Sequence, residues 1–251
     1  AIIYGILPFI ECKLKAFKSK CLYGYFKKEK TFHYRIIYPI CRNRIITNYY
    51  LSNRLVAYKH LTSLKIVDSK ISELKDSISY PQLTSLTILW SKISRLKRYP
   101  LLTSLNLQNC KEISELIAYP SLTSLYIFKS GISRLIRYTH LKTLKIADSE
   151  ISELIAYPQL FSLEIYKSNI SELRYYVFLT SLKIIGNSKI TKLIYYPHLT
   201  FLKIECCHKI SELIDYPLLI YLSIHNCKNL DYIETKSRDN IVKYIQNYVK
   251  K

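Results

Sequence analysis

The chain has 251 residues, of which 49% are hydrophobic and 22% charged, with a formal net charge of +20 at pH 7. This hydrophobic content excludes wholesale disorder, and no apolar run approaches the roughly 18 residues that indicate a membrane-spanning helix. Three of the seven cysteines recur at one position of a repeated pattern. That placement favours packing over a secreted disulfide framework and predicts a soluble protein in a reducing, cytoplasmic compartment.

The first 60 residues are the most basic part of the chain. They hold twelve lysines and arginines against Glu11 and Glu29, which gives +10, and the remaining residues supply the other +10. Residues 1–40 are interpreted as a basic N-terminal segment or cap, whose positive field could attract nucleic acid. The simpler alternative is codon bias, because a chain rich in Lys, Ile, Tyr and Asn with only four glycines is typical of an AT-rich genome.

From residue 61 onward the chain repeats one pattern nine times. Each unit reads Leu-x-x-Leu-x-Ile or Leu, then a Ser, Cys or Asn, then Ile or Leu and a last Leu or Ile, and it is usually closed by Tyr-Pro. The units begin 19 to 22 residues apart, at Leu61, Leu83, Leu102, Leu122, Leu141, Leu160, Leu179, Leu199 and Leu219. A fixed period of about 20 residues is typical of a solenoid, in which each unit buries its apolar side against its neighbours.

The spacing inside each unit predicts a strand. The second Leu and the following apolar residue lie two apart, so a strand would point both side chains to one face. We expect pairs such as Leu86 and Ile88, or Leu144 and Ile146, to point into the core, and the residues between and after them to point outward. Stacked units would then form a parallel sheet with strands about 4.8 Å apart.

A tyrosine recurs in register ahead of eight units, and proline follows six of these tyrosines. Because proline fixes φ and removes a donor, the return segments are expected to be short and extended. We interpret the tyrosines as packing on the back of the solenoid and not as a ligand-stacking stripe. The small polar or thiol residue after each strand is expected to bond to the backbone of adjacent turns. The tyrosines are Tyr80, Tyr99, Tyr119, Tyr138, Tyr157, Tyr176, Tyr196 and Tyr216.

Residues 61 to about 235 resemble the leucine-rich repeat family, whose units pair a Leu-x-x-Leu-x-Leu strand with an Asn or Cys turn position. Units that end in Tyr-Pro are similar to the short bacterial type, and the Cys-x-x-Ile units are similar to the cysteine-containing type of F-box adaptors. Serine at the turn departs from the family's asparagine ladder. The resemblance implies an α/β solenoid with a curved parallel sheet on the concave face, short extended or 3-10 convex segments, and a cap at each end.

The array is expected to span residues 41–235. A degenerate first unit from residue 41 is suggested by Tyr38, Pro39, Leu55 and Tyr58, and nine regular units follow from residue 61. Residues 236–251 are predicted to form a C-terminal capping helix with an N-cap at Ser237.

The resemblance implies that a partner protein binds the concave sheet face. The predicted site consists of outward strand residues together with Trp90: Lys65, Val67, Leu89, Trp90, Asn106, Gln108, Tyr126, Phe128, Lys145, Glu164, Tyr166, Lys183, Lys203 and Glu205. Leu89, Trp90, Tyr126, Phe128 and Tyr166 are predicted to form a mid-array aromatic patch. Lysines flank this patch, a composition typical of interface hot spots.

The predicted function is a non-enzymatic, monomeric protein–protein interaction module without a cofactor. Two alternatives remain open at this point. The segment ILPFIECKLKAF faintly resembles an F-box, which would make the chain a substrate-recognition adaptor of a ubiquitin ligase. The basic N-terminal segment, with the concave lysines, would instead favour binding of a polyanion such as nucleic acid.

Phosphate-binding loops and nucleophile signatures are missing from the sequence, so no catalytic residue is assigned. Cys206, Cys207, His208, His225 and Cys227 lie close in sequence, but strand alternation turns His225 away from the turn cysteines, so no metal site is predicted. A column of near-alternating charge predicts ion pairs between neighbouring units: Glu73, Arg95, Glu115, Arg134, Glu153, Glu172, Lys192 and Glu212.

Overall fold

The computed structural model describes residues 43–47, 60–67, 74, 80–187 and 189–248, which belong to one compact unit, Arg42–Lys251. The basic segment 1–40, with its faint F-box resemblance, and the degenerate-unit markers Tyr38, Pro39, Leu55 and Tyr58 lie outside the described residues. The adaptor and polyanion hypotheses depend mainly on that part of the chain and stay predictions.

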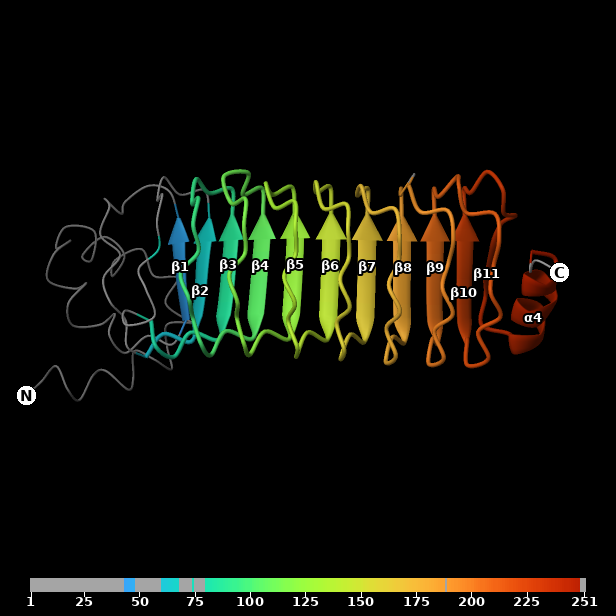
Figure 1. Cartoon of the computed structure of the whole chain (residues 1–251), viewed down its shortest axis with the longest axis horizontal. Coiled ribbons are helices and arrows are strands. Elements are labelled where there is room, and N and C mark those ends of the chain that lie inside the picture. The colour runs from blue at the N-terminus through green and yellow to red at the C-terminus, as the bar shows by residue number, and fades with distance from the viewer. Residues whose placement is uncertain (1–42, 48–59, 68–73, 75–79, 188, 249–251) are drawn as a thin grey trace, which may run out of the picture. The chain divides into compact units, whose positions relative to one another are not determined.

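One eleven-stranded sheet runs through this unit in simple sequence order (Figure 1). Strands β1 to β10 pair in parallel, each with the next strand along the chain, and β11 pairs antiparallel with β10. The strands are β1 (Asn43–Thr47), β2 (Ser63–Val67), β3 (Ser85–Leu89), β4 (Ser104–Gln108), β5 (Ser124–Phe128), β6 (Thr143–Ala147), β7 (Ser162–Tyr166), β8 (Ser181–Ile185), β9 (Phe201–Glu205), β10 (Tyr221–His225) and β11 (Ile233–Thr235).

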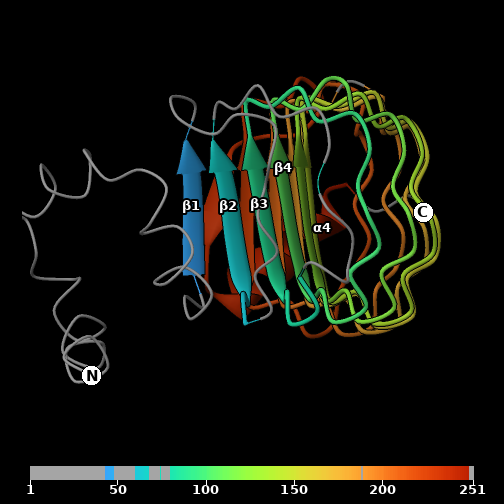
Figure 2. The same ribbon diagram turned by 90° about the vertical axis from the view of Figure 1, so that its left-hand side faces the viewer.

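The described residues form a β-solenoid in which each repeat unit makes one coil. Seen along the array, the sheet lies on one side and the return segments lie on the other (Figure 2). Within the described residues, the only helix is α4 (Arg238–Gln246), so the return segments are extended and contain no 3-10 turn. The repeat and the solenoid are therefore confirmed, whereas the helical part of the predicted α/β class is confined to α4. A β-helix fits this architecture.

The interior consists of the predicted leucines and isoleucines. Leu86 and Ile88 are fully buried, and Leu144 and Ile146 are at most 1% exposed. Because strands pair without a register shift, equivalent residues stack directly on one another along the array. Each buried Leu or Ile contributes roughly 1.5 to 3 kcal/mol relative to exposure, so this continuous apolar column is the main source of stability.

The last unit departs from the predicted pattern. Its fifth apolar residue, Ile233, does not line the inside of a return segment but begins β11, opposite Ile224. The chain turns back through an antiparallel bridge between Cys227 and Leu230, and this reversal ends the parallel stacking. An antiparallel strand can follow such a tight turn, whereas another parallel strand would need a complete coil.

The tyrosine column packs between the coils as predicted. All eight tyrosines are buried, and the rings of Tyr176 and Tyr196 stack with their centroids 6.3 Å apart. Most of the hydroxyls donate to a backbone oxygen of the preceding coil, for example Tyr196 to Arg174 at 3.0 Å and Tyr216 to Ile194 at 3.0 Å. The column therefore joins coils by both ring packing and hydrogen bonds.

The predicted bonds from the turn residue to the backbone of an adjacent coil form at Cys110, Asn187 and Cys207, whereas Ser91 and Ser130 bond within their own turns. The buried hydroxyl oxygens of Ser91 and Ser130 accept bonds from the main-chain nitrogens two residues further on. The thiol of Cys110 lies 3.4 Å from the oxygen of Ile88 in the preceding coil. The residue just before this turn position adopts a positive φ in eight coils, with values between 40° and 63°.

Threonines at the start of the strands form a ladder that the sequence analysis did not predict. The hydroxyl of Thr84 donates to the oxygen of Thr62 at 3.0 Å, and Thr103 donates to Thr84 in the same way. Thr123 continues the ladder at 3.1 Å, and Thr200 bonds to Thr180 further along. Each of these oxygens also accepts main-chain bonds from the next coil, for example Thr62 from the nitrogens of Thr84 and Ser85 at 2.9 and 3.0 Å, so the hydroxyls add to the main-chain bonds between coils.

Gly131 lies in the turn of its unit, between Ser130 and Ile132. This turn is one residue shorter than the turn between Cys110 and Ile113 in the preceding unit. A Cβ atom at position 131 would lie 2.2 Å from the main-chain oxygen of Lys111. Among the nine units, this is the only change from a long turn to a short turn, so the sequence places its glycine at the point of closest approach.

Changing Gly131 to alanine is therefore expected to lower the free energy of unfolding by about 1 to 3 kcal/mol, because the backbone of one coil must shift. Urea unfolding followed by circular dichroism measures this loss. The matched control is Ser133→Ala, an exposed position in the same coil, which should change stability by less than about 0.5 kcal/mol. Equal stability of the two variants would contradict the close-approach explanation.

Helix α4 follows the last strands. The hydroxyl of Ser237 accepts a bond from the main-chain nitrogen of Asn240, and Ile241 and Ile245 are buried. The main-chain nitrogen of Leu213 donates to the oxygen of Tyr248 at 3.2 Å, and Arg238 donates to the oxygen of Tyr216 at 2.9 Å. The helix therefore lies against the last full coil and shields its apolar residues from water. No helix among the described residues is long and apolar enough to cross a membrane.

The predicted ladder of ion pairs is wrong from Arg95 to Glu153, and its first member, Glu73, lies outside the described residues. Arg95, Glu115, Arg134 and Glu153 are all exposed, and no ion pair within 4.0 Å joins one of them to the next. Exposed side chains on the return segments are hydrated, and holding two long side chains together costs entropy that a surface pair barely offsets.

Candidate protein-binding surface

The third and fifth residues of the strands point away from the core and form what we call the outer sheet face. The structure places thirteen of the fourteen predicted site residues on this face: Lys65 and Val67 on β2, Leu89 on β3, Asn106 and Gln108 on β4, Tyr126 and Phe128 on β5, Lys145 on β6, Glu164 and Tyr166 on β7, Lys183 on β8, and Lys203 and Glu205 on β9. Trp90 follows β3 directly, with a φ of 48°.

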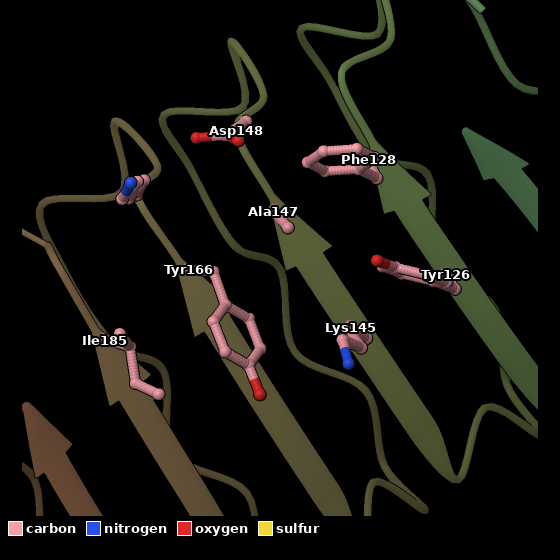
Figure 3. A pocket seen from close by; sticks show the side chains of 8 residues that line it. Tyr126, Phe128, Lys145, Ala147, Asp148, Tyr166 and Ile185 are labelled. Atoms are coloured by element: carbon pink, nitrogen blue, oxygen red, sulfur yellow. The ribbon is translucent and has the colours of Figure 1, made fainter. Parts of the chain in front are cut away.

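A depression of about 280 Å³ lies in the middle of the outer sheet face (Figure 3). Its lining comes from four neighbouring strands and the turns that follow two of them: Tyr126, Phe128, Lys145, Ala147, Asp148, Tyr166, Lys167 and Ile185. Four of these residues were predicted site residues. The other four, Ala147, Asp148, Lys167 and Ile185, were not assigned to the site.

The depression exists because Ala147 is small. In register across three strands, Ala147 lies between Phe128 and Tyr166, so two large rings flank a methyl group. Ala147 points outward as predicted, but only 6% of it is exposed, because its larger neighbours cover it. Its size was the available signal in the sequence, since every other member of this column is larger.

The predicted aromatic patch is only partly assembled. Tyr126, Phe128 and Tyr166 line the depression, whereas Leu89 and Trp90 do not. Strand β4 separates them from β5, and its outward residue Gln108 stands between the two groups. Trp90 remains 54% exposed, so it is a separate apolar group on this surface.

The remaining predicted residues do not line the depression. Lys65 and Val67 lie three strands away from β5, and Asn106 and Gln108 bond to each other at 3.1 Å on β4. On β9, Lys203 and Glu205 form an ion pair with a distance of 3.1 Å. The polar side chains on β4 and β9 therefore bond to each other in pairs along the flanks of the depression.

Lys145 lies between two aromatic rings at one end of the depression. Its ammonium nitrogen is 5.0 Å from the ring centroid of Tyr126 and 4.9 Å from that of Tyr166. The same nitrogen lies 3.3 Å from a carboxylate oxygen of Glu164. Figure 3 shows the lysine between these two tyrosines. Cation–π contact with two rings and one ion pair hold the lysine stem against the sheet.

Glu164 is ionised and fully engaged beside the depression. The hydroxyl of Tyr166 donates to its carboxylate at 2.7 Å. Burial acts in the opposite direction, but this hydrogen bond and the charges of Lys145 and Lys183 hold the pKa of Glu164 below its ordinary value. Burial and the bond to Glu164 raise the pKa of Tyr166, so its hydroxyl keeps its proton and remains a donor.

Lys167 reaches the depression across a glycine. A Cβ atom at Gly186, the next member of the positive-φ column, would lie 2.9 Å from Cγ of Lys167. The lysine stem therefore lies over the bare backbone of the following coil. Gly186 itself has a φ of 63°, a conformation that glycine adopts without strain.

Comparisons of the chain with protein-family models, curated proteins and solved structures returned no match. The chemistry of the described residues therefore carries the functional assignment. Among them, no group of three or more His, Cys, Asp or Glu side chains is arranged to hold a metal ion. Burial raises the pKa of the Cys110 and Cys207 thiols to about 11, which keeps both protonated near neutral pH.

Proposed function

We propose that the chain is a non-enzymatic protein-interaction module that seats a partner on the outer sheet face, over the depression between β5 and β8. The observation that carries this proposal is the depression itself, in which three aromatic side chains surround an alanine and lysines stand at the rim. Aromatic anchors beside charged groups are enriched in the central part of protein interfaces. Exposed clusters of large apolar groups mark interaction sites more often than inert surface.

The variation along the array supports the same function. The inward positions hold only Leu and Ile in the nine units, whereas the outward positions include Lys, Thr, Asn, Tyr, Glu and Ser. A repeat scaffold can therefore keep one core while its exposed surface is specialised for one partner. We further propose that the solenoid is a leucine-rich repeat array. The Leu-x-x-Leu-x-Ile strand and the buried Cys110, Asn187 and Cys207 at the turn position support this assignment.

Replacing both Phe128 and Tyr166 with serine is expected to weaken partner binding by at least about tenfold, because each would remove an aromatic anchor of a hot spot. Affinity capture from an extract of the source cells, with quantitative identification of the bound proteins, measures this loss. The matched control is Phe161→Ser, which removes a ring that is 53% exposed but does not line the depression. If both variants retain every partner of the wild-type protein, the outer sheet face is not the binding site.

A further inference from the structure

We infer that the depression receives one bulky apolar side chain of an extended acidic segment of the partner, and that Lys167 and Lys183 bind the neighbouring carboxylates. This inference rests on the proposed protein-binding function and specifies the chemistry of the partner. It follows from the size of the depression, the charges around it and the arrangement of the two lysines.

The size of the depression suits a single side chain. Its volume of about 280 Å³ lies below the range of roughly 300 to 1,000 Å³ that is typical of small-molecule pockets. The methyl group of Ala147 forms the floor between the rings of Phe128 and Tyr166, and Ile185 lines the depression beyond Tyr166. A leucine or an aromatic ring of the partner would cover these groups and bury apolar area on both sides.

The charges at the rim favour an acidic partner. Four lysines and two carboxylates surround the depression: Lys129, Lys145, Lys167, Lys183, Asp148 and Glu164. Lys129 lies 4.0 Å from Asp148 and Lys145 lies 3.3 Å from Glu164, so both carboxylates have a lysine partner. The net charge of this group is therefore +2, and it comes from the other two lysines.

Lys167 and Lys183 are the cations that an acidic segment would contact. Among the described residues, neither has a carboxylate within 4.0 Å. Lys183 stands over the Tyr166 ring at 5.8 Å, and the stem of Lys167 lies over Gly186. Lys167 directly follows β7 and Lys183 lies in β8, so both lysines are on the same side of the depression. They would therefore bind acidic residues on one side of the inserted apolar side chain.

A protein segment fits this surface better than a nucleic acid does. A peptide can place single carboxylates beside Lys167 and Lys183 and away from the acidic side chains of Asp148 and Glu164, whereas a nucleic acid carries a phosphate at every nucleotide. A strand of nucleic acid also needs successive stacking platforms. Here the large rings of Phe128 and Tyr166 are separated by Ala147 and form the walls of one depression.

The test is selection from a random-peptide phage library on the wild-type protein, followed by fluorescence anisotropy with the selected peptides. We expect the enriched peptides to carry one Leu, Phe, Tyr or Trp next to Asp or Glu. The variant Ala147→Ile fills the depression and should weaken these peptides by at least about tenfold. The double variant Lys167→Glu/Lys183→Glu should weaken them by a similar factor and remove most of the dependence on salt.

Two control variants match these changes. Thr87→Ile places the same side chain on the outer face of β3, away from the depression, and Lys65→Glu reverses a charge on β2. Both should bind the selected peptides with unchanged affinity. Circular dichroism and thermal unfolding of every variant would establish that the solenoid remains folded, so that lost binding reports the surface.

The outcomes separate this inference from the proposed function. Suppose that the enriched peptides carry no acidic residue but bind the double variant Phe128→Ser/Tyr166→Ser more weakly than the wild-type protein. This result would overturn the inference and would still support the protein-binding function. The inference would also be overturned, in favour of nucleic acid, if an oligothymidine bound more tightly than any selected peptide and lost its affinity in the double variant Lys167→Glu/Lys183→Glu. If no peptide is enriched on the wild-type protein relative to the Ala147→Ile variant, the inference is overturned. The capture experiment tests the proposed function independently.

Discussion

Replacing Asn187 with leucine is expected to lower the free energy of unfolding by about 3 to 5 kcal/mol, although the two side chains are similar in size. Asn187 is fully buried, and its amide nitrogen donates to the oxygens of Ser168 and Ile170 at 3.3 and 3.1 Å. Its amide oxygen accepts from the nitrogens of Lys189 and Ile190 at 2.8 and 2.9 Å. The amide nitrogen also donates to the hydroxyl oxygen of Ser168 at 3.3 Å. Leucine would remove all five bonds, and each buried unsatisfied group costs about 1 to 3 kcal/mol.

The matched control for this change is Asn169→Leu. Asn169 is exposed, and its amide bonds only to the carboxylate of Glu150 at 3.3 Å, so the same substitution should cost less than about 0.5 kcal/mol. Urea unfolding followed by circular dichroism gives both values. If Asn187→Leu is as stable as this control, the buried amide does not hold the two coils together.

The core of this protein could be predicted from the sequence because a single rule is repeated. In a strand, alternate side chains share a face, so the Leu and Ile positions had to point inward wherever the unit was repeated. Leu86, Ile88, Leu144 and Ile146 are buried for this reason. The tyrosine column could also be predicted, because a residue that recurs once in each coil stacks on the equivalent residue of the neighbouring coils.

The candidate site was less accessible to the same reasoning. The depression depends on the relative sizes of Phe128, Ala147 and Tyr166, which lie about 20 residues apart and meet only across the sheet. Alternation showed that these side chains point outward, but it did not show that Ala147 leaves a space between them. Trp90 does not join the aromatic residues of the depression, because β4 lies between β3 and β5.

Features that depend on side-chain conformation could not be derived from the pattern. Lys145 was predicted to point outward beside the aromatic patch, and the structure adds its two ring contacts and its ion pair with Glu164. The proposed ladder around Arg95 and Glu115 failed for the same reason, since long side chains on neighbouring coils can also extend into water. Equal spacing in the sequence brings backbones together but does not fix the ends of flexible side chains.

Changing Tyr176 to alanine is expected to cost about 3 to 5 kcal/mol, because it removes a ring from the closed back of the solenoid. Tyr176 is 1% exposed and stacks between Tyr157 and Tyr196, with centroid distances of 6.4 and 6.3 Å. Its hydroxyl donates to the oxygen of Ile155 at 3.1 Å. The substitution therefore leaves a cavity and one main-chain oxygen without its donor, and urea unfolding measures the combined loss.

Two further variants separate these contributions. Tyr176→Phe keeps the ring and removes only the bond to Ile155, so it should cost about 1 kcal/mol. The neighbouring Tyr175 is 52% exposed, and Tyr175→Ala should cost less than about 1 kcal/mol, because little buried surface is lost. A loss with Tyr176→Phe as large as with Tyr176→Ala would show that hydrogen bonding, and not ring packing, joins the coils. Equal losses for Tyr175→Ala and Tyr176→Ala would contradict the burial of the tyrosine column itself.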